Sequence, residues 1–79
     1  RLHLGGSHLA YGWRPDLAIY CKALANGHPL AACCGRAAHQ AAASRVFLTG
    51  SYWHDPAPLA AALKVLEIAD RENIPARLE

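Results

Sequence analysis

The chain has 79 residues, a formal net charge of +2 and 53% hydrophobic residues. This length allows one small domain at most, close to the lower limit for a self-sufficient core. Because the charge is small and the arginines are scattered, the composition gives little support to nucleic-acid binding. No apolar run approaches the roughly 18–20 residues that span a bilayer, and no signal-peptide layout opens the chain. We therefore expect neither a nucleic-acid partner nor a membrane partner.

The chain contains no methionine, even at its first position, and we interpret it as an excerpt or processed piece of a longer protein. Its cysteines make an odd count: Cys21, Cys33 and Cys34. The adjacent Cys33 and Cys34 are poorly placed to serve one tetrahedral metal site or to form an ordinary disulfide with each other. We expect small buried thiols in a reducing cytoplasm, and no metal site.

Residues 1–14 are rich in glycine and small polar residues, which predicts a loop or an irregular approach. Pro15 disfavours helix at the residue before it and prepares an extended entry. Leu17 to Tyr20 then form a short apolar run bounded by Pro-Asp and a charged residue, which predicts a buried strand. The run does not alternate, and this suits a strand covered on both faces, as in α/β proteins.

A turn is predicted over residues 25–29, because Asn-Gly readily adopts positive φ and the following proline stops any helix. Leu30 to Cys34 form a second apolar run and a second predicted strand, which Gly35 ends. Arg36 to Ala43 are alanine-rich and predict a short helix. Val46 to Leu48 are a third strand candidate.

The clearest element is a helix from about Pro56 to Glu72. Asp55 can act as its N-cap, and Pro56 is suited to the first helical position. Its expected apolar face is formed by Leu59, Leu63 and Leu66, widened by Ala62, Val65 and Ala69. Its expected charged face is formed by Lys64, Glu67 and Arg71, with Glu67 four residues before Arg71. Strands that alternate with helices indicate an α/β architecture.

Lys22 follows the first predicted strand and is the only lysine that lies amid apolar residues. An amine at the end of a buried strand loses its proton cheaply, since desolvation lowers the pKa of a lysine. A neutral amine is what nucleophilic attack on a carbonyl carbon requires. The alternative is a surface lysine whose stem lies along apolar atoms.

Two segments around Lys22 carry a resemblance to a known family. The first, residues 11–32, reads YGWRPDLAIYCKALANGHPLAA. Its spacing from Pro-Asp-Leu to the lysine, and on to Asn-Gly-x-Pro, matches the pattern YG-x-x-PDL-x-x-x-x-KA-x-x-NG-x-P-x-A-A without a gap. This segment resembles the cofactor-lysine region of class III aminotransferases, a group that includes the glutamate-1-semialdehyde aminomutases.

The second segment, residues 49–56, reads TGSYWHDP and leads into the alanine-rich helix. It is similar to the stretch downstream of that lysine, where a threonine contacts the cofactor phosphate, commonly from the partner subunit. Alignment on Tyr52-Trp53 and Pro56 puts Ser51 in the threonine position, and Thr49 is the alternative. A hydroxyl beside backbone amides near a glycine is suited to a phosphate oxygen.

The resemblance implies a fold-type I enzyme dependent on pyridoxal 5'-phosphate, with Lys22 as the internal aldimine lysine. Residues 1–79 are then one α/β segment of its large domain. The cofactor-lysine strand and turn lie at 15–35, the phosphate-contact loop at 49–55 and the helix at 56–72. The implied reaction transfers an amino group between small-molecule donors and acceptors, or within one molecule. The implied assembly is a cytoplasmic homodimer, with the region of Ser51 at the subunit interface.

The chain departs from the family pattern in ways that leave the site incomplete. In the family an aspartate well upstream of the lysine pairs with the pyridinium nitrogen, whereas Asp16 here belongs to Pro-Asp-Leu and is interpreted as a turn or cap residue. The glycine-rich phosphate turn and the carboxylate-binding arginine are not visible either. We therefore expect the isolated chain to be inactive.

The competing hypothesis is a small non-catalytic α/β interaction module with a structural lysine. It predicts that the isolated chain is folded and monodisperse, and that its binding is indifferent to Lys22→Ala.

Overall fold

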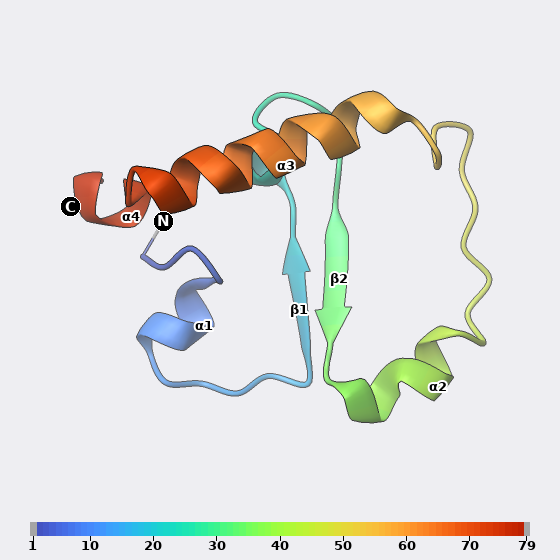
Figure 1. The fold of residues 1–79 in the computed structure, drawn as a ribbon. Coiled ribbons are helices and arrows are strands. Elements are labelled where there is room, and N and C mark those ends of the chain that lie inside the picture. Colours follow the sequence, from blue (N-terminus) through green and yellow to red (C-terminus); the bar gives the residue numbers. More distant parts are fainter. Residues whose placement is uncertain (1, 79) are drawn as a thin grey trace.

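The computed structural model describes residues 2–78. It contains short helices, single 3-10 turns (η) and one pair of strands, in the order α1 (Ser7–Ala10), β1 (Leu17–Tyr20), η1 (Lys22–Leu24), β2 (Ala32–Gly35), η2 (Ala37–His39), α2 (Gln40–Ala43), α3 (Pro56–Arg71) and α4 (Ile74–Arg77). Figure 1 shows the two strands side by side, with α3 crossing them at the end where η1 lies. The arrangement is a small mixed α/β fold, which agrees with the class predicted from sequence.

The two strands form an antiparallel hairpin in which Leu17 pairs with Gly35 and Tyr20 pairs with Ala32. Both strands were predicted, and the first has the predicted bounds. The second begins two residues later than Leu30 and includes Gly35. A Cβ atom at Gly35 would lie 2.9 Å from Leu17 Cδ2, so glycine gives the leucine its space.

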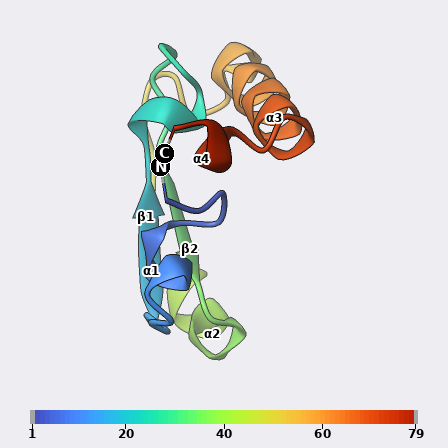
Figure 2. The same ribbon diagram turned by 90° about the vertical axis from the view of Figure 1, so that its left-hand side faces the viewer.

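The prediction that β1 is buried on both faces is wrong for this chain. Its burial alternates, with Leu17 and Ile19 exposed and Ala18 and Tyr20 half-buried. The half-buried side is tied to the N-terminal segment, where the Tyr20 hydroxyl donates to the Gly5 carbonyl at 2.8 Å. Figure 2 shows α3 to one side of the hairpin and no helix or strand of residues 2–78 on the opposite side. An apolar run without alternation therefore does not establish two covered faces.

The three thiols, predicted to be buried, are exposed and unpaired among the described residues. Cys33 and Cys34 lie within β2, and Cys21 directly follows β1. With only two strands, the hairpin has too little cover to bury any of them.

The segment between the hairpin and α3 is only partly as predicted. The helix expected over residues 36–43 is present as η2 followed by α2. The third strand expected at Val46–Leu48 is wrong, since these residues are neither helix nor strand. Figure 1 shows this segment bowing away from the hairpin, so it does not pair with the free outer edge of β2.

The predicted long helix is confirmed as α3, with Pro56 at its start and Asp55 as its N-cap. The Asp55 carboxylate accepts a hydrogen bond from the Ala57 amide at 3.0 Å. The predicted charged face is confirmed by ion pairs from Glu67 to Lys64 and to Arg71.

The apolar face of α3 is partly as predicted, since Ala62 is buried and Val65 and Ala69 are half-buried, but it is rotated away from the leucines. The buried side chains are Pro58 and Ala62, whereas the expected core leucines are exposed, Leu63 by 71%. Small residues turn toward the hairpin because they let the helix approach the η1 turn closely. The leucines therefore form a separate exposed stripe along the same helix.

Candidate functional site

Lys22 opens the η1 turn, one residue after Cys21 and two after the end of β1. Its place at the end of a short strand is as predicted. Its side chain is exposed within residues 2–78, which agrees with the surface-lysine alternative and contradicts the interpretation of a desolvated amine. It has no hydrogen bond or ion pair with any of these residues, which leaves its amine open to a ligand.

The backbone of Lys22 is in an unusual conformation. Its φ angle is +52°, in the left-handed region, directly after an extended Cys21 with φ −158°. For a residue with a Cβ atom, this conformation is unfavourable by roughly 1–2 kcal/mol relative to the right-handed one. Such residues persist only where the surroundings hold them, and they gather at functional sites. The sequence pattern gave no sign of this conformation, because lysine has no preference for it.

The turn that carries Lys22 is closed by local hydrogen bonds. The Leu24 amide donates to the Cys21 carbonyl at 3.1 Å, and the His28 amide donates to the Ala25 carbonyl at 3.3 Å. Asn26 and Gly27 have φ angles of +43° and +108°, which confirms the predicted positive-φ turn at Asn-Gly. The chain therefore reverses direction between β1 and β2 through a tightly bent connection that begins at Lys22.

Helix α3 supports this connection from one side. Ala25 is 1% exposed and is the most buried residue of the described core, while Ala62 of α3 is 7% exposed. The helix packs on the η1 turn, and Figure 1 shows it crossing there. Both buried residues are small, so the two backbones approach closely. The element with the clearest sequence signal thus packs on the turn that carries the candidate lysine.

The two candidate phosphate contacts, Thr49 and Ser51, lie in the irregular segment before α3. Both are exposed, and neither hydroxyl forms a hydrogen bond with another residue in the range 2–78. Around them the Trp53 amide donates to the Gly50 carbonyl at 3.2 Å, which bends the chain into a turn. No hydrogen bond joins Lys22 to either hydroxyl. The described residues therefore provide the amine and the hydroxyls as separate groups.

A second cluster lies at the opposite end of the hairpin and was missed as a cluster. Asp16 was interpreted as a turn or cap residue, but its carboxylate accepts from Arg36 at 3.1 Å and lies 3.4 Å from His39 Nε2. The hydrogen bond with His39, and then the Arg36 guanidinium, hold the pKa of Asp16 below its usual range. These partners are 20 and 23 residues away in sequence, a separation that local patterns do not reveal.

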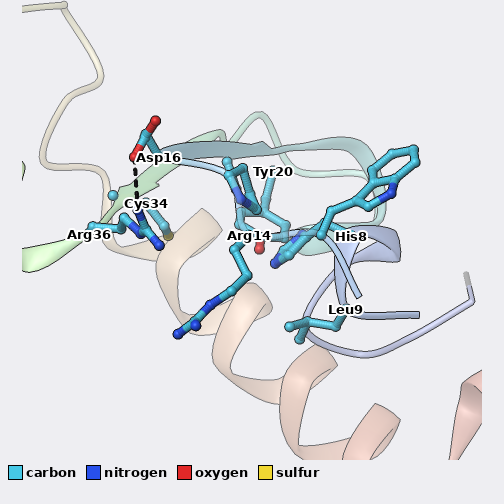
Figure 3. A pocket seen from close by; sticks show the side chains of 11 residues that line it. His8, Leu9, Arg14, Asp16, Tyr20, Cys34 and Arg36 are labelled. Carbon is cyan, nitrogen blue, oxygen red and sulfur yellow. Dashed lines mark hydrogen bonds and ion pairs between the residues drawn. The ribbon is translucent and has the colours of Figure 1, made fainter. Parts of the chain in front are cut away.

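The Asp16 cluster borders a shallow open hollow of about 270 Å³. Figure 3 shows Asp16 and Arg36 joined on one side, with Arg14, His8 and Tyr20 around the rest. Lys22 does not line this hollow. The hollow is therefore distinct from the candidate cofactor site, and Asp16 is already occupied by two basic partners.

Across residues 2–78, no group of three histidine, cysteine or acidic side chains is arranged to hold a metal ion. No helix there is long and apolar enough to cross a bilayer.

Comparison with characterised proteins gives a consistent result. The chain is 37% identical over 75 residues to a 3-aminobutyryl-CoA aminotransferase of Cloacimonas acidaminovorans (strain Evry), which covers 94% of this chain and 18% of that protein. It is 40% identical over 63 residues to a 4-aminobutyrate aminotransferase of Escherichia coli (strain K12), covering 80% and 15%. It is 38% identical over 86 residues to a glutamate-1-semialdehyde 2,1-aminomutase of Neisseria meningitidis serogroup B (strain ATCC BAA-335 / MC58), covering 100% and 20%.

The chain is homologous to the class III aminotransferases. This confirms the resemblance drawn from the two motifs around Lys22. The chain spans a fifth or less of the length of these three relatives. No family model matches it, and no solved structure matches it.

The residues present fit one part of a pyridoxal-phosphate site. Lys22 offers an amine that is exposed and unpaired within residues 2–78, and Ser51 and Thr49 offer hydroxyls that are equally unengaged. Asp16, the acid closest in sequence to Lys22, is not free for the pyridinium nitrogen, because it is bound to Arg36 and His39. Residues 2–78 thus offer a candidate amine for bonding the cofactor, while the acid closest in sequence to that amine is already paired with basic groups.

Proposed function

We propose that residues 1–79 are the cofactor-lysine segment of a pyridoxal-phosphate-dependent aminotransferase or aminomutase. Homology over most of the chain supports the class of enzyme. The single observation that carries the assignment to Lys22 is its place in the ungapped motif, as an exposed amine at the end of β1. The segment would belong to the large domain of a fold-type I enzyme, in a cytoplasmic homodimer.

In this proposal Lys22 bonds the cofactor, and Ser51 or Thr49 donates a hydrogen bond to a phosphate oxygen. Pyridoxal phosphate, when bound, supplies an aldehyde carbon and a ring that accepts negative charge. The neutral Lys22 amine has a lone pair for attack on that carbon. Once displaced by the amine of a small-molecule donor, Nζ can take up a proton and return it. The hydroxyl is the candidate contact at the subunit interface, supplied to the partner's site.

Chemical trapping on the complete polypeptide tests this proposal. The amine nitrogen bonds the aldehyde carbon with loss of one water, and borohydride then adds a hydride that makes the bond permanent. Peptide mapping is expected to find the label on Lys22. Lys64 is the matched control, because it is the other lysine and is paired with Glu67 on α3. Label that survives Lys22→Ala but not Lys64→Ala would contradict the assignment.

The same experiment separates the competing hypothesis of a non-catalytic interaction module. A structural lysine would take up no cofactor, and Lys22→Ala would leave the labelling of every peptide unchanged. The exposed and unpaired side chain argues against a structural role, since it forms no hydrogen bond or ion pair with residues 2–78 that would stabilise the fold.

A further inference from the structure

Lys22 is the only residue of η1 with a left-handed backbone, and nothing within the turn itself explains this conformation. The hydrogen bond from Leu24 to Cys21 closes the turn but does not require positive φ at the residue between. An isolated peptide would relax to negative φ, because the left-handed region brings Cβ too close to the following carbonyl oxygen. A contact from outside the turn must therefore hold it.

That contact is on the side of α3. Within residues 22–25 the exposure changes sharply: Lys22 and Ala23 are exposed, Leu24 is half-buried and Ala25 is almost completely buried. The helix packs on this turn through the face that carries Pro58 and Ala62. Ala25 directly follows η1 and is 1% exposed, so a larger side chain at this position has no free space and would displace the turn.

We propose that the packing of Ala25 against α3 holds Lys22 in its left-handed conformation and thereby positions the Lys22 amine for the cofactor. Ala25 is then a positioning residue that acts through the backbone and does not touch the cofactor. The claim that the packing holds the Lys22 backbone is independent of the cofactor. The claim that the packing positions the Lys22 amine rests on the proposed function of Lys22.

The conformational half is tested by the order of stability of two substitutions in the complete polypeptide without cofactor. Where φ is positive, glycine is tolerated and alanine is strained; where φ is negative, alanine is the more stable residue. We expect Lys22→Gly to melt about 1–2 °C above Lys22→Ala. Ala23→Gly is the matched control in the same turn: φ at Ala23 is negative, so this change is expected to lower the melting temperature.

The link between the packing of Ala25 and the conformation of Lys22 is tested by comparing the same two Lys22 variants in a protein with a larger side chain at position 25. In the Ala25→Val background, the turn is expected to leave its place against α3 and Lys22 to relax. The order is then expected to reverse, with Lys22→Ala melting above Lys22→Gly. If Lys22→Gly still melts above Lys22→Ala in that background, the packing does not hold the conformation and the proposal is overturned.

If Ala25→Val prevents folding, the contact between the turn and α3 is instead disturbed by a larger side chain on the helix. Ala62→Val enlarges the buried face of α3, and Ala60→Val makes the identical change at an exposed position of the same helix. Only Ala62→Val is expected to reverse the order of the two Lys22 variants. Reversal by both changes, or by neither, would contradict the proposal.

The positioning half is read from the rate of borohydride trapping at Lys22. Ala25→Val, or Ala62→Val in its place, is expected to slow it by on the order of ten-fold, because a small displacement of a reacting group is costly. Absence of label on Lys22 in the unaltered protein would refute the proposed function and leave the conformational result standing. Equal trapping rates in the variant and the unaltered protein would refute positioning alone.

Discussion

Asp16 joins segments that are distant in sequence, and it does so with both its backbone and its side chain. Its carbonyl accepts from the Arg36 amide at 3.2 Å, and its carboxylate accepts from the Arg36 guanidinium at 3.1 Å. His39 Nε2 approaches the same carboxylate oxygen. The open end of the hairpin is therefore closed by one residue. All three side chains are exposed, so water and salt weaken these contacts.

The ionisation of Asp16 makes this closure sensitive to acid. The hydrogen bond with His39, followed by the Arg36 guanidinium, lowers the pKa of Asp16 in the folded state. A carboxylate with a lowered folded pKa contributes stability above its unfolded value of about 3.9, and loses it as pH falls through the folded pKa. We expect amide-exchange protection at Arg36 to be constant from pH 7 to 5 and to fall below about pH 4.

Asp16→Asn is the matched control for that measurement, because it keeps the shape of the side chain and removes the charge. Its protection at Arg36 is expected to be lower at pH 6 and to show no further step in acid that comes from position 16. An acid step of the same size in the variant and in the unaltered protein would show that another group controls this end of the hairpin.

At the scale of elements, the start of α3 depends on one cap. The Asp55 carboxylate accepts from the Ala57 amide at 3.0 Å and satisfies a donor that the helix leaves unpaired. Asp55→Ala is expected to lower the free energy of unfolding by about 1 kcal/mol, measured by urea denaturation of the complete polypeptide. Asp55→Asn retains an acceptor and is expected to cost much less. Equal losses from both substitutions would contradict the capping role.

The elements differ in how well the sequence predicts them, and the reason is physical. Helix α3 begins at Asp55-Pro56 and the turn after Lys22 bends at Asn26-Gly27, because each is specified by local steric and hydrogen-bonding rules. The strand expected at Val46–Leu48 is absent because the segment does not pair with either free edge of the two-stranded hairpin, and local apolar character does not determine such pairing. The side of α3 that faces the hairpin also depends on non-local packing. The Asp16 cluster likewise depends on non-local contacts, because its two basic members lie 20 and 23 residues after Asp16.

The candidate site likewise combines features that local sequence predicts with features that depend on non-local packing. Lys22 is selected as the candidate cofactor lysine by motif spacing, which the sequence displays directly. Its exposure and its positive φ do not, because they depend on what packs against the turn. Whether Ser51 or Thr49 serves the phosphate stays a prediction, since residues 2–78 bring neither hydroxyl to Lys22 with a hydrogen bond.

For the whole molecule, the exposed surface area indicates whether the chain can fold on its own. The accessible area is 6675 Å² for a mass of 8.5 kDa, whereas a compact monomer of that mass has roughly 4,700 Å². The Cα radius of gyration is 14.1 Å, against roughly 11.6 Å for a compact domain of this length. The buried apolar side chains are Ala25, Pro58 and Ala62, and none of the large ones is fully buried. The chain therefore exposes far more surface, and buries far less apolar volume, than a compact monomer of its mass.

An isolated chain of 79 residues is accordingly expected not to fold cooperatively. Ordering each residue costs roughly 1–2 kcal/mol of conformational entropy, and three small buried side chains offset very little of that cost. Circular dichroism is expected to show low helicity with a gradual, uncooperative thermal change, and amides in β1 are expected to exchange at the rate of an unfolded peptide. The complete polypeptide is the control, in which the same amides are expected to be protected. A monodisperse isolated chain with a sharp melting transition would contradict this expectation, and it would favour the interaction module over the aminotransferase segment.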